Sequence, residues 1–338
     1  MNTYPSYLIH NVNIVTPAGT IENGWALLQD GRIDAIGEAG QSVPDAPDGA
    51  AARIVQDGSG GYLIPGFIDV HVHGGFGHDF MDAGHEGLDA ITRFHAQHGT
   101  TSMLATSLTA SRAQITDTLK QVQDYMNNPM PYARLIGVHL EGPFINVALK
   151  GAQNPDYIVP PQPEWLEQWV KDFPGLIKIM TLAPEIEGAT SFIELLDRNG
   201  IVPSCGHTNS TYAQMIEAAD HGLRHAVHTY NAMKPYHHRE PGTVGAVLSD
   251  PRIICEVIAD GHHVHPGGIR LLLAAKGADR IILITDAMMA AGMPDGIYKL
   301  GGLDVTLSDG MARLLEGDSL AGSVLTMIDA FRFVVQQL

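Results

Sequence analysis

The sequence is poor in cysteine, in basic residues and in long apolar runs, and each shortage excludes a class of protein. Cys205 and Cys255 are the two cysteines among 338 residues, too few for a disulfide framework and in keeping with a reducing cytosol. Lys plus Arg number 20 against 37 Asp plus Glu, a formal charge of −17, which argues against binding to nucleic-acid phosphates. No stretch approaches the roughly 18 apolar residues of a membrane helix, and the first residues do not form a signal peptide. We therefore expect a cytoplasmic protein without nucleic-acid or membrane partners.

Apolar residues are plentiful, at 45% of the chain, so a folded core is expected. After residue 61, short apolar runs alternate with helical patterns, as a (β/α)₈ barrel of the TIM type requires. An open doubly wound sheet is the competing fold, but no Gly-rich dinucleotide fingerprint follows any of the runs. The predicted strands are 66–73, 101–106, 135–141, 177–182, 201–207, 224–229, 253–259 and 281–286. The predicted helices between them include 87–98, 113–126, 191–199, 211–221 and 267–276.

Two further segments are read as β-structure. Within residues 1–61, the segment 7–15 alternates apolar and polar positions, and the segments 25–28 and 32–36 flank an Asp30-Gly31 hairpin turn. These patterns predict a small antiparallel sheet as a separate domain. Residues 62–338 then form the barrel domain, with a β excursion near 296–317 and a last helix over 323–337. The late strands either join the N-terminal sheet or remain an excursion from the barrel.

Metal-capable side chains lie where the predicted barrel strands end. His71 and His73 are two residues apart on one strand, so both imidazoles point to the same face and can bind one divalent ion. Glu141 closes an apolar strand, where an unpaired carboxylate is costly unless a cation meets it. A carboxylated Lys178 is the rival bridging ligand. The carboxyl ends of barrel strands converge on one face, so these residues predict a metal centre there.

Three later strand ends complete the pattern. His207 and His228 close consecutive strands, and Asp286 closes the last one. A carboxylate beside an activated water can take its proton and return it later, which suits Asp286 for general base catalysis. Cys205, two residues before His207, is a weaker candidate ligand, because buried thiols are usually inert.

Donor groups gather in segments 231–239 and 260–263, which follow two of these strands. In a chain of charge −17, local cationic groups at a site suggest an anionic substrate group such as phosphate. Lys234, His237 and His238 are better read as residues of a solvated loop.

Together these motifs resemble the amidohydrolase superfamily, and closely the N-acetylglucosamine-6-phosphate deacetylases. The matching stretches are PGFIDVHVHGGFG from Pro65, HLEGPFIN from His139, KGAQNP from Lys150, GHTNS from Gly206, HTYNAM from His228, REPG from Arg239, ADGHHV from Ala259, TDAM from Thr285 and LAGS from Leu320. The resemblance runs over essentially the whole chain from about Tyr7.

The resemblance implies a role for each site residue. Glu141, His207 and His228 would hold the principal metal, and His71 and His73 would complete a second site with Glu141 bridging. Asp286 would be the general base and then the acid. The substrate-binding residues implied are Ala152, Gln153, Asn231, Ala232, Arg239, His263, Leu320, Ala321 and Gly322, of which Arg239 and His263 would meet the sugar phosphate. The metal would be one or two divalent ions, zinc first, with iron, manganese or cobalt as alternatives.

The implied reaction removes the acetyl group of N-acetylglucosamine 6-phosphate, giving glucosamine 6-phosphate and acetate in amino-sugar catabolism and cell-wall recycling. The partner would be an amino-sugar phosphate, and the protein a homodimer whose phosphate site is completed across the interface. The alternatives are another amidohydrolase, either a cyclic-amide hydrolase or a deacetylase of a different N-acetyl hexosamine phosphate, and a catalytically silent metal-binding barrel.

Two features depart from the family pattern. Gln153 stands where the family often has histidine, and an amide can hydrogen-bond a carbonyl but cannot become cationic. Relatives also continue past the position of Leu338 with strands that return to the N-terminal sheet, so we expect the small sheet to lack them here.

Overall fold

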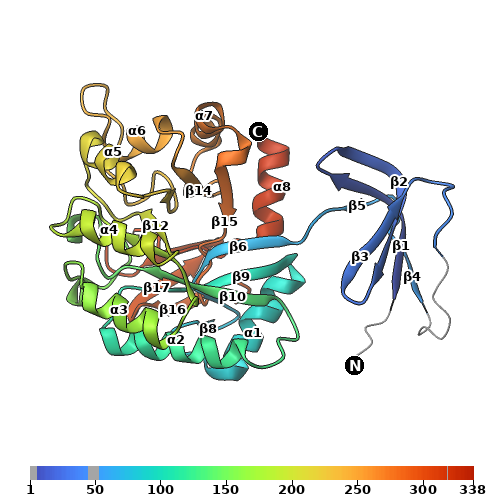
Figure 1. The fold of residues 1–338 in the computed structure, drawn as a ribbon, viewed down its shortest axis with the longest axis horizontal. Helices are drawn as coiled ribbons and strands as arrows, with labels where there is room; N and C mark the ends of the chain where they lie inside the picture. Colours follow the sequence, from blue (N-terminus) through green and yellow to red (C-terminus); the bar gives the residue numbers. More distant parts are fainter. Residues whose placement is uncertain (1–5, 45–52, 318) are drawn as a thin grey trace. The chain divides into compact units, whose positions relative to one another are not determined.

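The computed structural model describes residues 6–44, 53–317 and 319–338 (Figure 1). The chain folds into two compact units, Met1–Gly66 and Phe67–Leu338, with a boundary slightly later than the predicted one. No helix in the described ranges combines the length and the apolarity needed to cross a membrane.

The first unit is a five-stranded sheet built around a hairpin. Its strands are β1 (Tyr7–Thr16), β2 (Gly19–Gln29), β3 (Arg32–Gly37), β4 (Ile54–Asp57) and β5 (Tyr62–Leu63). β2 and β3 pair antiparallel across Asp30-Gly31, and both turn residues have positive φ, 49° and 72°, as a tight hairpin turn requires. β1 pairs antiparallel with β2 but parallel with β4 and β5. Val12, Ile14 and Ala26 form its small core.

The second unit is the predicted (β/α)₈ barrel. Its parallel strands, neighbours in chain order, are β6 (Phe67–Val72), β9 (Thr100–Ser107), β10 (Arg134–Glu141), β11 (Ile177–Leu182), β12 (Val202–Cys205), β13 (His225–Ala226), β14 (Ile254–Ile258) and β15 (Ile281–Ile284). The last strand meets the first through Asp286, whose backbone N–H donates to the His71 carbonyl at 2.9 Å, and through Ala287, whose carbonyl accepts from His73 at 2.8 Å. These bonds close the barrel at the carboxyl end of the strands.

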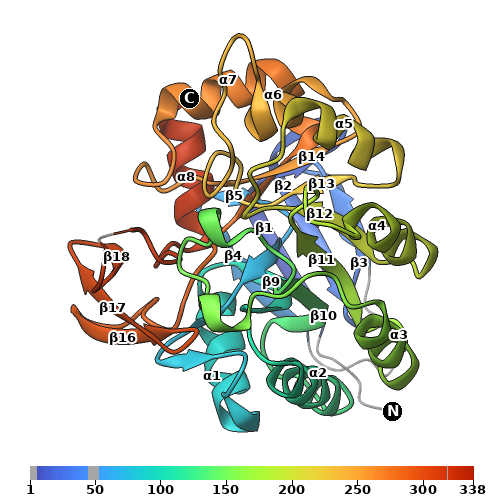
Figure 2. The same cartoon turned by 90° about the vertical axis from the view of Figure 1, so that its left-hand side faces the viewer.

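Helices cover the outside of the strands (Figure 2). They are α1 (Gly84–Gln97), α2 (Arg112–Met126), α3 (Pro163–Asp172), α4 (Ala189–Arg198), α5 (Tyr212–Asp220), α6 (Gly242–Ser249), α7 (Pro266–Lys276) and α8 (Met327–Gln337). α2 and α5 begin at capping boxes, Ser111 with Gln114 and Thr211 with Gln214, which satisfy otherwise unpaired N–H groups of the first turn. Buried apolar side chains between helices and strands form one continuous core.

The late strands are an excursion from the barrel. β16 (Gly296–Leu300), β17 (Leu303–Ser308) and β18 (Met311–Leu314) form a three-stranded antiparallel sheet of their own. Leu300, Val305 and Leu307 from this sheet pack with Leu108, which follows β9, and with Met288, which follows β15. Of the two arrangements open from the sequence, the excursion is therefore the one found, because the apolar face of this sheet is buried against barrel loops.

Candidate metal and catalytic centre

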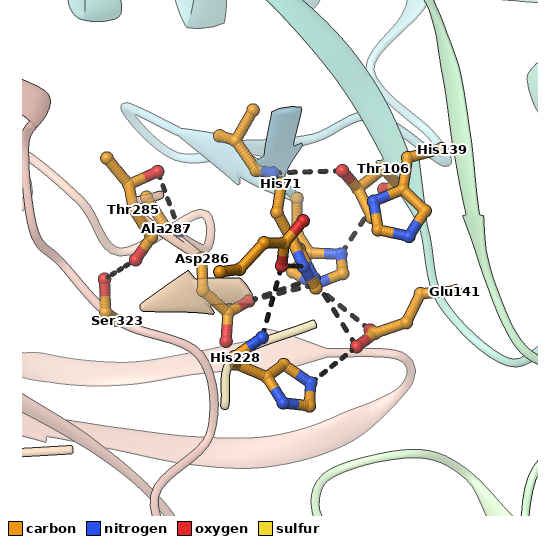
Figure 3. A network of polar contacts seen from close by, with 12 residues as sticks. His71, Thr106, His139, Glu141, His228, Thr285, Asp286, Ala287 and Ser323 are labelled. Atoms are coloured by element: carbon orange, nitrogen blue, oxygen red, sulfur yellow. Dashed lines mark hydrogen bonds and ion pairs between the residues drawn. The ribbon is translucent and has the colours of Figure 1, made fainter. Parts of the chain in front are cut away.

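All six residues predicted from the strand ends lie at the carboxyl face of the barrel. His71 and Glu141 belong to the last residues of β6 and β10, while His73, His207, His228 and Asp286 follow their strands by one or two residues. Each of the six is at most 8% exposed. Figure 3 shows the His71, Glu141, His228 and Asp286 side chains directed toward one centre.

Glu141 is the hub of the cluster. Its Oε1 lies 2.9 Å from Nε2 of His228, 3.1 Å from Nε2 of His207 and 3.4 Å from Nε2 of His71. Its Oε2 lies 3.4 Å from Nε2 of His73. Asp286 Oδ1 lies 3.1 Å from Nε2 of His73 and 3.7 Å from Nε2 of His71. Side chains from five strand ends therefore gather in one place. His71, Glu141 and His228 form one set with ligand atoms close enough to share an ion, and His71, His73 and Asp286 form another. His207 joins them through its contact with Glu141.

The four imidazoles are held in the orientation of metal ligands. Each turns Nδ1 outward to an acceptor and leaves Nε2 facing the centre: His71 to Glu256 Oε2 at 2.8 Å, His73 to the Thr106 carbonyl at 3.3 Å, His207 to the Leu149 carbonyl at 3.0 Å and His228 to the Asn231 carbonyl at 3.2 Å. Because these partners accept, Nδ1 carries a proton, so an ion at the centre would take the place of any proton that Nε2 shares with the carboxylates. His71 Nε2 is buried without a hydrogen-bond partner. Buried imidazole nitrogens and carboxylates in this arrangement fit a divalent ion.

The electrostatics of the cluster also favour a cation at this point. Burial alone would raise the pKa of Glu141, but His71, His207 and His228 hold that pKa well below its usual value. Burial opposes ionisation of Asp286 too, and His71 and His73 still lower its pKa to about 2. Conversely, burial lowers the pKa of His73, yet Asp286 and Glu141 raise it to about 9. The paired carboxylates therefore attract positive charge, as protons or as a metal.

Strained backbone collects at the same place. His207, His228, Ala232 and Asp286 all adopt positive φ, at 47°, 26°, 50° and 50°. Non-glycine residues rarely do so, and each instance costs of the order of 1–3 kcal/mol. The fold therefore holds these four against local preference, which is typical of functional sites.

Two further buried polar side chains, Glu256 and His139, lie next to the cluster, and Glu256 was missed from the sequence. Glu256 in β14 accepts from His71 Nδ1 and from the His228 backbone N–H at 3.2 Å. Burial opposes its ionisation, but neighbouring histidines lower the pKa of Glu256 to about 2. His139 bonds Thr181 Oγ1 at 2.8 Å, and burial lowers its pKa to about 3. A charged residue in the middle of an apolar strand was the signal available for Glu256.

The two alternative ligands do not belong to the cluster. Lys178 is exposed on β11. Cys205 is fully buried, and burial raises the pKa of its thiol. Among the described residues, Cys205 belongs to no set of ligand atoms close enough together to share an ion.

A cavity of about 400 Å³ opens over the cluster. Seven of the predicted substrate residues line it: Ala152, Gln153, Asn231, Ala232, His263, Leu320 and Gly322. Leu108, Leu300 and Ser319 also line it and were not predicted. His263 is fixed by Asp260, whose Oδ2 lies 2.6 Å from its Nδ1.

Two predicted substrate residues lie outside the lining. Ala321 is fully buried and packs in the apolar cluster of the β excursion, so its side chain supports the wall. Arg239 is exposed, with Nη1 2.9 Å from Nε2 of His238. In this chain the Arg239 guanidinium therefore does not reach the cavity.

Comparisons with known proteins identify the family of this chain. Residues 62–337 match the amidohydrolase family. The chain is 39% identical over 330 residues to the N-acetylglucosamine-6-phosphate deacetylase of Bacillus subtilis (strain 168), covering 97% of this chain and 82% of that protein. It is 37% identical over 331 residues to the N-acetylgalactosamine-6-phosphate deacetylase of Escherichia coli O157:H7, and this match covers 98% of this chain and 84% of that protein.

A solved structure shows the same fold. A mutant of N-acetyl-D-glucosamine-6-phosphate deacetylase from Mycobacterium smegmatis, in complex with N-acetyl-D-glucosamine-6-phosphate, matches this chain with a TM-score of 0.89 at 33% identity. The match covers 99% of this chain and 84% of that one.

Proposed function

The chain belongs to the amidohydrolase family, and from that membership and the geometry of the site we propose that it hydrolyses the acetamido group of N-acetylglucosamine 6-phosphate. The products are glucosamine 6-phosphate and acetate. The observation that supports the proposal is the gathering of four histidines around Glu141 and Asp286, with five of these six residues lining one cavity. Likeness over nearly the whole of this chain to deacetylases of N-acetyl hexosamine phosphates supports the substrate class.

Glu141, His207 and His228 would hold the principal metal, and His71 and His73 would hold a second ion with Glu141 between the two. When bound, such an ion lowers the pKa of a coordinated water toward about 7 and so supplies hydroxide at neutral pH. Zinc is the first candidate, with iron, manganese and cobalt as alternatives, because imidazole and carboxylate suit all four.

Asp286 would move the proton. Its carboxylate lines the cavity and is ionised at neutral pH, because His71 and His73 outweigh burial and lower its pKa to about 2. It can therefore accept a proton from the attacking water. It then returns that proton to the departing amine, which would otherwise be a poor leaving group.

The cavity walls would bind the sugar phosphate. His263 lines the cavity, whereas Arg239 is exposed outside it. The proposal therefore includes a homodimer in which Arg239 completes the phosphate site of the neighbouring subunit. Phosphate binding would fix the sugar for attack, so its loss falls on affinity and positioning. The expected setting is cytoplasmic amino-sugar catabolism and cell-wall recycling.

The deciding experiment pairs elemental analysis of the purified protein with acetate release from N-acetylglucosamine 6-phosphate. N-acetylgalactosamine 6-phosphate, unphosphorylated N-acetylglucosamine and a cyclic amide are assayed in parallel to separate the alternatives. We expect bound divalent metal, a preference for the phosphorylated glucosamine derivative, and a raised KM in Arg239→Ala. Bound metal with neither acetate release from the N-acetyl sugars nor ring opening of the cyclic amide would instead indicate a silent metal-binding barrel.

A further inference from the structure

Gln153 lies at the point where the cavity wall meets the metal cluster. It follows the short helix η1 (Val147–Leu149) in the loop after β10, and its residue is 3% exposed. Its backbone N–H donates to the Lys150 carbonyl at 2.9 Å, which closes a turn and anchors the residue. The side chain thus projects from a fixed backbone into a buried, polar setting.

Both ends of the Gln153 amide are bound. The Thr109 backbone N–H donates to Oε1 at 2.7 Å, and Nε2 donates to Glu141 Oε2 at 2.6 Å. A backbone N–H needs an acceptor and a carboxylate needs a donor, so both partners require the same orientation of the amide. The amide therefore cannot flip without losing two buried hydrogen bonds.

Thr109, which donates to Gln153, also packs closely against the residue that follows Glu141. Gly142, the next residue after Glu141, has φ of 86°, and a Cβ there would lie 2.2 Å from Thr109 Oγ1. A side chain at Gly142 would push the two loops apart. Thr109, Gln153 and Glu141 consequently form a single packed unit.

We propose that Gln153 is a positioning residue of the metal centre, which fixes the rotation of the Glu141 carboxylate so that Oε1 faces His207 and His228 while Oε2 faces His73. This inference rests on the proposed metal site. It gives Gln153 a task other than the substrate contact implied by resemblance. Each oxygen of the Glu141 carboxylate faces a different group of histidines, so a hydrogen-bond donor on one oxygen keeps both oxygens correctly oriented.

The test compares Gln153→Met with wild type. Methionine has a similar length but neither donor nor acceptor for these two partners. Co²⁺ affinity is measured by competition with a chromophoric chelator, and the visible absorption of the Co²⁺-loaded protein reports ligand geometry. We expect Gln153→Met to bind Co²⁺ about 10- to 100-fold more weakly, with shifted absorption bands and a KM for N-acetylglucosamine 6-phosphate within about twofold of wild type.

Two further variants complete the design. Gln153→His offers one accepting and one donating ring nitrogen, so it should restore most of the affinity and the wild-type spectrum. Gln168→Met makes the same chemical change on the exposed face of α3, where Gln168 bonds Asp172, and should change nothing. Should Gln153→Met fail to fold, Gln153→Asn takes its place, because the shorter amide cannot span Thr109 and Glu141 together.

Unchanged Co²⁺ affinity and spectrum in the Gln153 variants, together with a raised KM, would overturn the proposal and assign Gln153 to the substrate. A wild-type protein that binds no Co²⁺ would overturn both this inference and the proposed function. A wild-type protein that binds Co²⁺ but releases no acetate would overturn the function alone, since the comparison of metal affinities would still decide the role of Gln153.

Discussion

Replacing Glu256 by glutamine should weaken metal binding although no proposed metal ligand is changed. Glu256 Oε2 receives two hydrogen bonds, from His71 Nδ1 at 2.8 Å and from the His228 backbone N–H at 3.2 Å. Both partners are donors, so the substituted glutamine must present its carbonyl oxygen to them. The shape is kept, and the charge on the acceptor is the main property that changes.

The magnitude follows from that loss of charge. A hydrogen bond to a charged group contributes about 1.5–3 kcal/mol and a neutral one about 0.5–1.5 kcal/mol. The change should therefore reduce the metal-binding free energy by about 1–2 kcal/mol, because His71 is less well oriented and less basic. That corresponds to roughly a 5- to 30-fold loss of metal affinity. Glu256 is ionised across the assay range, because its histidine neighbours outweigh burial and lower its pKa to about 2.

The assay is competition with a chromophoric chelator at about pH 7.5, with thermal unfolding of the metal-free protein as a check on folding. Glu194→Gln is the charge-matched control, since Glu194 pairs with His221 on the outer helices, away from the cluster. A metal affinity of Glu256→Gln within about twofold of wild type would refute the reasoning. It would mean that packing alone orients His71.

Two other changes probe the catalytic carboxylate and the acid stability of the barrel. Asp286→Asn should leave metal content intact and slow acetate release by about 10²- to 10⁴-fold, because the proton carrier is lost; near-normal turnover would remove Asp286 from that role. His95 is fully buried, with Nε2 bonded to the Gly74 carbonyl at 3.0 Å and Nδ1 unpartnered, and burial lowers its pKa to about 4. In the unfolded chain the His95 imidazole is protonated below about pH 6.5, whereas in the folded chain it is protonated only near pH 4. The stability of the fold therefore falls as the pH falls through this window. Between about pH 7.5 and pH 5, the unfolding free energy from urea titrations should therefore fall by about 2 kcal/mol less in His95→Gln than in the wild type. An equal fall in both proteins would contradict the low pKa of His95.

The barrel could be predicted because local patterns mark most of its strands. These strands are apolar runs between polar helical segments, and α2 and α5 carry capping signals in the sequence itself. The helix α6 was not predicted, since its glycines and β-branched residues favour other conformations. Six of its eight residues are buried, so packing against neighbouring helices outweighs that local preference.

Local apolar patterns identify the ends of the barrel strands. They were enough to predict that Glu141, His207 and Asp286 lie together, because the carboxyl ends of parallel barrel strands share one face. Contacts between segments distant in the chain depend on how loops and strands pack, and no local pattern encodes them. Only the folded chain shows that Glu256 hydrogen-bonds His71, that Gln153 spans Thr109 and Glu141, and that Arg239 lies outside the cavity of its own subunit.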